Sequence, residues 1–134
     1  MKRSDLIKEC DRLFSILVRL EETNENGIGK CYICYKKLHY RDMENMHYHP
    51  RRNMNTRYYR DNCHGGCFTC NVELQGNMKA YSEALESNDV NLIELQFLAR
   101  SIEKIMTFEL EEIRNKLNIL CKEFLKDKNF TVTI

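Results

Sequence analysis

Two cysteine pairs of the form CxxC constrain the fold of this chain more than any other feature. Two residues between cysteines let one turn of backbone aim both sulfurs at a single tetrahedral ion. Together the pairs supply the four thiolates of a closed structural zinc site, Cys31, Cys34, Cys67 and Cys70. The stretch between the pairs is too poor in aliphatic residues to build a core. We therefore expect zinc binding, worth on the order of 10 kcal/mol of folding free energy, to stabilise it.

Length and cysteine use limit the class of protein. A chain of 134 residues is one domain. Its 7 cysteines are odd in number, and four of them form the two CxxC pairs. Both features favour zinc binding in a reducing compartment over the disulfides of a secreted protein. No apolar run is long enough to span a bilayer, and the N-terminus lacks the apolar core of a signal peptide. We expect a cytoplasmic protein without a membrane partner.

The net charge of +1 hides an uneven distribution. Between the cysteine pairs, many basic residues and interleaved tyrosines accompany only three carboxylates, Asp42, Glu44 and Asp61. This combination suits a polyanion such as DNA better than a small metabolite. Arg51, Arg52 and Arg57 are candidates for phosphate contacts, and the alternative for each is an ordinary solvated charge.

The stretch 31–77 has the pattern of a small metal-bound core. Loose alternation of apolar and polar residues predicts two short strands near 45–49 and 56–60. A helix is expected to begin near His64 and to carry the second cysteine pair. Strand, strand and helix around a metal is the ββα arrangement of HNH nucleases, also called His-Me finger nucleases.

Helices are expected on both sides of this core. Apolar residues at helical spacing predict an N-terminal helix over 4–22 with Ser4 as N-cap. The region 78–128 is expected to form one or two helices split near Asn88, then a last helix capped by Thr107. Cys10 and Cys121 lie on apolar faces and should be buried thiols. The fold class is thus α+β, mainly helical, in a single domain over 1–134.

Three polar residues inside the core suggest phosphodiester hydrolysis, which needs an activated water and a Lewis acid. His47, at the end of a predicted strand, is the candidate general base, because a near-neutral imidazole can take a proton from water. A zinc ligand or a surface histidine is the alternative, but four cysteines already complete a zinc shell. Asn62 would orient the His47 ring or act as a helix N-cap. The Asn71 oxygen would ligate magnesium or manganese, or simply lie on a helix surface.

Several roles are open for two further histidines. His49 and His64 would each serve as a second ligand of the catalytic metal, as a phosphate donor, or as a solvated side chain. Cys63, four residues before Cys67, is an alternative zinc ligand, but its spacing suits zinc less well than that of the CxxC pairs.

Several separate segments resemble the bacteriophage NinG family, also called Rap, over roughly residues 10–125. The matching features are LFSILVRL in the first helix, the knuckle CYIC, the pairs His47-Tyr48 and Arg57-Tyr58, and an ordered core of Asn62, His64, Cys67, Cys70, Asn71, Gly76, Asn77 and Tyr81. The chain departs from the family pattern at three positions. Tyr35 stands where a knuckle usually has glycine, Gly66 replaces glutamine, and Met46 stands where the family has a small residue and many HNH enzymes have an acidic ligand.

The resemblance implies a structure-specific endonuclease acting on branched DNA, including Holliday junctions and D-loops. It leaves the second ligand of the catalytic metal unassigned. Two alternatives stay open: a non-catalytic zinc module that binds DNA, and an HNH nuclease acting on linear duplex DNA. A homodimer would suit the near-twofold symmetry of a four-way junction, but the apolar stripes beyond residue 80 fit an intrachain core as well.

Overall fold

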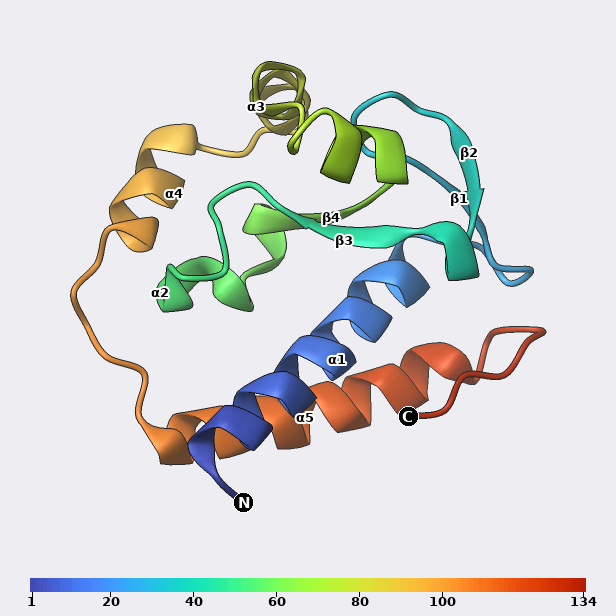
Figure 1. Cartoon of the computed structure of the whole chain (residues 1–134). Coiled ribbons are helices and arrows are strands. Elements are labelled where there is room, and N and C mark those ends of the chain that lie inside the picture. The colour runs from blue at the N-terminus through green and yellow to red at the C-terminus, as the bar shows by residue number, and fades with distance from the viewer.

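The computed structural model describes residues 1–134 and combines helices with two small antiparallel sheets (Figure 1). The mainly helical α+β class is confirmed, with about 54% of the chain in helices. The elements in chain order are α1 (Arg3–Glu21), β1 (Ile28–Lys30), β2 (Lys37–His39), η1 (Tyr40–Asp42), β3 (Glu44–His47), α2 (Met54–Arg57), η2 (Arg60–Asn62), β4 (Cys63–Gly66), η3 (Thr69–Glu73), α3 (Met78–Ser87), α4 (Leu92–Ala99) and α5 (Thr107–Leu125).

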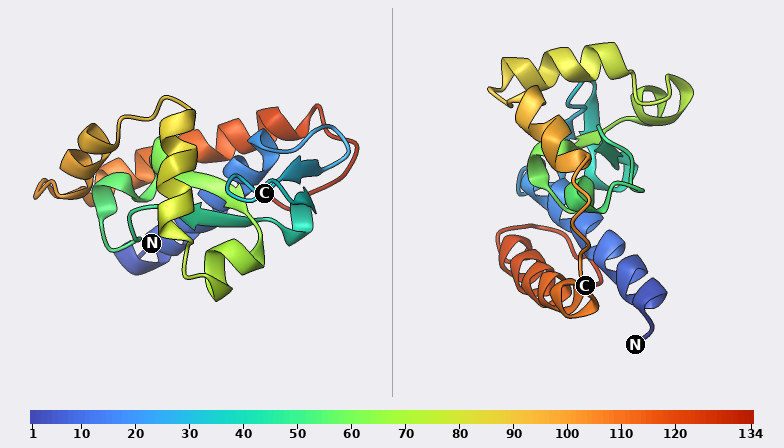
Figure 2. Two further views of the ribbon diagram at one scale, coloured as in Figure 1. Left: turned by 90° about the horizontal axis from the view of Figure 1, so that it is seen from above. Right: turned by 90° about the vertical axis from the view of Figure 1, so that its left-hand side faces the viewer.

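Helix α1 is the centre of the molecule, with α5 along one side and the β3–β4 hairpin on the other (Figures 1 and 2). The two helices run parallel: Arg3 Nη1 donates to Thr107 Oγ1 over 3.1 Å at their starts, and Lys128 Nζ donates to the Leu20 carbonyl over 2.7 Å at their ends. The thiols of Cys10 and Cys121 are buried in this packing, as expected. None of the helices is both long and apolar enough to cross a membrane.

The predicted helix boundaries hold to within a few residues. The N-cap of α1 is Lys2 rather than Ser4, and the N-cap of α5 is Met106 rather than Thr107. Thr107 lies one residue inside α5, where its hydroxyl accepts from Arg3. The split near Asn88 is confirmed by the break between α3 and α4. The C-terminal tail forms no strand and is held in place, because its side chains Phe130, Val132 and Ile134 pack against the core between α1 and α5.

The second predicted strand is misplaced. Residues 54–57 form the short helix α2, and the partner of β3 is β4, with Met46 opposite His64 and His47 opposite Cys63. The segment near residue 57 is β-prone by composition, but Arg57 and Tyr58 both contact Asp11 of α1. Tertiary contact thus overrides local propensity here. The helical segment after β4 begins at Thr69 rather than near His64, so the second cysteine pair lies at its edge.

Two departures from the family pattern compensate each other across the β3–β4 hairpin. Met46 is completely buried, and a Cβ atom added at Gly66 would overlap its sulfur and methyl carbon. A large residue on β3 therefore requires a residue without a side chain on β4. This explains why methionine and glycine occur together in this chain.

Candidate functional site

The four paired cysteines form one cluster that fits a zinc ion. Their sulfur atoms all lie within 4.8 Å of one another, and the sulfurs of Cys34 and Cys67 are 3.7 Å apart. A tetrahedral site with Zn–S bonds of about 2.3 Å places its sulfurs about 3.8 Å apart. The β1–β2 hairpin presents the first pair; Cys67 lies between β4 and η3, and Cys70 lies in the first turn of η3. The expected ligand set is therefore assembled, and these cysteines would hold a structural zinc.

Cys63 does not belong to this cluster. Its side chain is buried in the core beside α1, where its sulfur lies 3.9 Å from the Thr56 carbonyl oxygen. Burial raises the pKa of the Cys63 thiol, which keeps it protonated. It does not compete for zinc in this fold.

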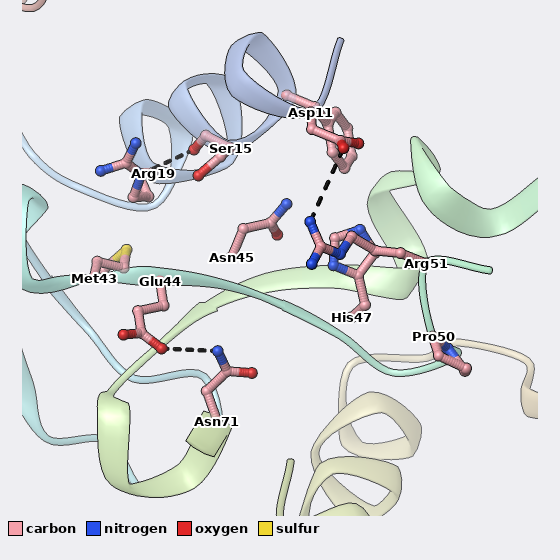
Figure 3. A pocket seen from close by; sticks show the side chains of 11 residues that line it. Asp11, Ser15, Arg19, Met43, Glu44, Asn45, His47, Pro50, Arg51 and Asn71 are labelled. Atoms are coloured by element: carbon pink, nitrogen blue, oxygen red, sulfur yellow. Dashed lines mark hydrogen bonds and ion pairs between the residues drawn. The ribbon is translucent and has the colours of Figure 1, made fainter. Parts of the chain in front are cut away.

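A groove of about 600 Å³ runs along β3, between α1 and η3 (Figure 3). We call it the β3 groove; its charged and hydrogen-bonding lining includes Asp11, Arg19, Glu44, His47, Arg51 and Asn71. Helix α1 supplies one wall, and β3 with η3 supplies the other (Figure 3). Two of the three predicted catalytic residues, His47 and Asn71, therefore meet in one cavity, whereas Asn62 does not line it.

His47 is held in an orientation that suits a base. Its Nε2 lies 3.0 Å from the Arg57 carbonyl oxygen. A carbonyl only accepts hydrogen bonds, so Nε2 carries the proton and the lone pair of the neutral ring is on Nδ1. Burial is the main cause that lowers the pKa of His47 from its ordinary 6.5. The ring is therefore neutral at pH 7, with an acceptor nitrogen free of other hydrogen bonds.

Asn62 positions the loop after β3 rather than the ring of His47. Its side chain is fully buried, and its Oδ1 accepts from the His49 backbone N–H over 2.8 Å. Its Nδ2 donates to the carbonyls of His49 and Thr56. The expected contact with the His47 ring is absent, because the Arg57 carbonyl occupies that place. Asn62 ends the short helix η2, so it is not a helix N-cap either.

Asn71 pairs with a carboxylate that the sequence argument did not single out. Its Nδ2 donates to Glu44 Oε1 over 2.8 Å, from η3 to the start of β3 (Figure 3). The signal was present in the sequence, since Glu44 is one of only three acidic residues between the cysteine pairs. Carboxylate and amide oxygens are ligands that magnesium and manganese accept, and Mg²⁺ commonly takes one or two protein ligands plus water and phosphate. Glu44 and Asn71 fit that requirement.

Of the four residues expected to contact DNA, only Arg51 lines the β3 groove. Its Nη1 lies 3.9 Å from Asp11 Oδ2, but the side chain is 63% exposed and can also reach a phosphate. Arg52 is exposed but lies in a different hollow, beside the start of α5. Arg57 is engaged with Asp11 through two hydrogen bonds of 2.8 and 2.6 Å. His64 stacks on Tyr32, its Nδ1 lies 3.2 Å from Glu22 Oε2 and its Nε2 is buried, so it is not free to meet a phosphate.

His49 is also separated from the proposed metal ligands. It does not line the β3 groove, and its Nε2 is buried without a hydrogen-bond partner. The four cysteines are the one group of three or more metal-ligating His, Cys, Asp or Glu residues in the structure. The position of His49 therefore gives no support to its predicted role as a ligand of the catalytic metal.

Comparison with known proteins gives one match. The family model described as "Bacteriophage Lambda NinG protein" matches residues 1–127. No curated protein and no solved structure matches the chain.

Proposed function

The chain belongs to the NinG family of bacteriophage recombination proteins, and from this premise we propose that it is a metal-dependent HNH-type endonuclease acting on branched DNA. The observation that carries the proposal is the His47 ring in the β3 groove. The Arg57 carbonyl fixes its tautomer, and its lowered pKa keeps it neutral. Its free Nδ1 is the atom that would take a proton from water.

The reaction follows from these positions. His47 Nδ1 accepts a proton as a water molecule attacks the phosphorus of the scissile phosphodiester. The bond from phosphorus to one ester oxygen breaks, and that oxygen leaves as a hydroxyl group after it takes a proton from a second water molecule. Glu44 and Asn71 would hold a magnesium or manganese ion, which supplies Lewis-acid stabilisation of the phosphate charge. Glu44 thus takes the ligand position that the sequence left unassigned. Arg51, at the same groove, would contact a neighbouring phosphate.

A non-catalytic zinc module that binds DNA is the second candidate. One observation favours it: apart from the cysteine cluster, the structure brings no three His, Cys, Asp or Glu residues together as metal ligands. A nuclease acting on linear duplex shares the proposed chemistry and differs only in its substrate. Cleavage assays separate all three proposals.

The experiment compares a labelled four-way junction with its matched linear duplex, in magnesium or manganese, for the wild type and His47→Ala. Because general base catalysis contributes about 10²–10⁴-fold, we expect the variant to lose at least 100-fold in rate while binding the junction normally. His39→Ala is the matched control, since His39 lies on β2 outside the groove. Zinc content is measured in each protein so that loss of the fold is not mistaken for loss of catalysis.

Each outcome selects one proposal. Preferential junction cleavage that requires His47 supports the branch nuclease. Equal cleavage of both substrates supports the linear-duplex nuclease, and binding without cleavage by either protein supports the zinc module. Full activity of His47→Ala would show that another group is the base.

Homodimer formation remains a separate proposal. Ile93 and Phe97 on α4 are 68% and 76% exposed, and Ile102 in the following segment is 95% exposed. These side chains offer apolar area for a second copy. Light scattering with and without junction DNA tests the dimer, and a monomeric mass under both conditions would contradict it.

A further inference from the structure

The tip of the zinc-binding hairpin carries an aromatic residue in an unfavourable conformation. Tyr35 directly follows the first cysteine pair and has a φ of 63°, in the left-handed region that favours glycine. The tight turn imposes this conformation, since the Tyr35 N–H donates to the Cys31 carbonyl over 3.0 Å. The tyrosine ring is 65% exposed, so its burial offsets little of the cost. Glycine at this position would satisfy the turn without strain.

The strands of the same hairpin place like charges opposite each other. Lys30 on β1 is paired with Lys37 on β2 in the antiparallel register. Like charges directly opposite each other destabilise a strand pair. Lys36 lies next to them, all three side chains are exposed, and none of them forms an ion pair. The hairpin therefore contains a second feature that is unfavourable in the free protein.

A single kind of ligand would relieve the charge repulsion and use the exposed ring. We propose that the hairpin tip binds an unpaired nucleotide of branched DNA, with the base stacked on Tyr35 and phosphates held by Lys30, Lys36 and Lys37. A hollow of about 490 Å³ adjoins the ring, and Lys30 and Tyr32 also line it. Arg60 and Glu22 lie in the same hollow but pair with each other over 3.0 Å, so the lysines supply its unpaired positive charge. Stacking on aromatic side chains combined with basic residues along the backbone is how proteins bind single strands.

The site would select branched over linear DNA, which deepens the proposed function and rests on it. Bases inside a duplex are already stacked on their neighbours, so an exposed tyrosine ring meets a free base face only where strands separate. The displaced strand of a D-loop contains such nucleotides, and a branch point contains them where its base pairs open. The Tyr35 site would thus contribute to substrate choice, while His47 performs the chemistry.

A tryptophan substitution gives a direct probe, because the chain has no tryptophan of its own. Tyr35→Trp places a single fluorophore at the hairpin tip. Titration with an oligothymidylate, with the zinc retained and no other divalent ion added, should quench its fluorescence as a base stacks on the indole. Phe108→Trp is the control, because residue 108 is similarly exposed, at 59%, and lies at the start of α5, which is far from the hairpin (Figure 1). Equal quenching of both proteins, or of neither, would overturn the proposal.

Affinity measurements supply an independent test. Tyr35→Gly removes the ring and the backbone strain together, so the variant should fold and bind zinc at least as well as the wild type. We expect it to bind the oligonucleotide about 5- to 100-fold more weakly, whereas Tyr35→Phe should bind like the wild type. Replacing the three lysines with glutamine should reduce the slope of log K against log salt by about 2. Unchanged affinity in Tyr35→Gly would overturn the proposal.

The nuclease proposal and the binding proposal fail in different ways. Quenching and Tyr35-dependent affinity without cleavage would remove the nuclease and leave the binding site. Junction cleavage with unchanged affinity in Tyr35→Gly would remove the binding site and leave the nuclease.

Discussion

Replacing Asp11 with alanine should destabilise the protein by about 3 kcal/mol, because Arg57 loses the charge that compensates its own. Arg57 Nε lies 2.8 Å from Asp11 Oδ1, and Nη2 lies 2.6 Å from Oδ2. Burial alone would raise the pKa of Asp11, but hydrogen bonds and charge from Arg57 outweigh it and hold the pKa below 3.8. The carboxylate is therefore charged at neutral pH.

The magnitude follows from the exposure of the two side chains, 15% for Arg57 and 22% for Asp11. Breaking a buried pair costs about 3–5 kcal/mol, whereas an exposed pair contributes about 0–1 kcal/mol. This degree of burial places the cost near the lower end of the buried range. In a domain of this size it should lower the melting temperature by about 10 °C.

The assay is a double-mutant cycle of Asp11→Ala and Arg57→Ala, followed by urea unfolding at pH 7 with zinc present. We expect the double variant to lose about 2 kcal/mol less unfolding free energy than the two single variants lose together, because the second change removes the charge that the first leaves unpaired. Glu9→Ala is the matched control. Glu9 pairs with Arg12 at 2.6 Å, but these side chains are 33% and 42% exposed, so its loss should cost less than about 1 kcal/mol.

A coupling energy below about 0.5 kcal/mol would contradict a buried ion pair between Asp11 and Arg57. It would mean that Arg57 is solvated in the protein and free to contact phosphate, as the sequence suggested. A large coupling energy would instead establish Arg57 as the link between α1 and the carbonyl that holds the His47 ring.

Three further outcomes are expected. Burial lowers the pKa of His47, and protonation would occupy its Nδ1. The rate of single-turnover cleavage should therefore fall as the pH drops, with its midpoint below pH 6.5. A midpoint above pH 6.5 would contradict a buried neutral base. Gly66→Gln should destabilise the protein through overlap with Met46, and adding Met46→Gly should recover much of the loss in thermal unfolding, whereas additive effects would contradict compensation. Cys31→Ser or a zinc chelator should remove most of the folding free energy of the zinc-bound core, as measured by urea unfolding. The circular dichroism signal of the packed helices α1 and α5 should largely remain, because they belong to a separate core. Simultaneous loss of all helix signal would show that both cores depend on zinc.

Spacing along the chain was sufficient to predict the cluster of four cysteines and the first and last helices. The reason is that ligand geometry in a CxxC turn and apolar periodicity in a helix are local properties. The break between α3 and α4 was equally visible, because turn-forming residues mark it. The second strand was misplaced because residues 56–60 are β-prone in isolation, and only the contacts with Asp11 show why they fold otherwise.

The detailed site depended on pairs of residues far apart in sequence. Asp11 and Arg57 are 46 positions apart, and Glu44 and Asn71 are 27 apart, so no local pattern joins them. Only the docking of α1 on the β3–β4 hairpin shows that Arg57 is engaged and that its carbonyl orients His47. Only the position of η3 beside β3 shows that Glu44 accompanies Asn71. Residue type and spacing limit which groups can do chemistry. Packing decides which of these groups are free and which are engaged, because burial and pairing are properties of the whole fold.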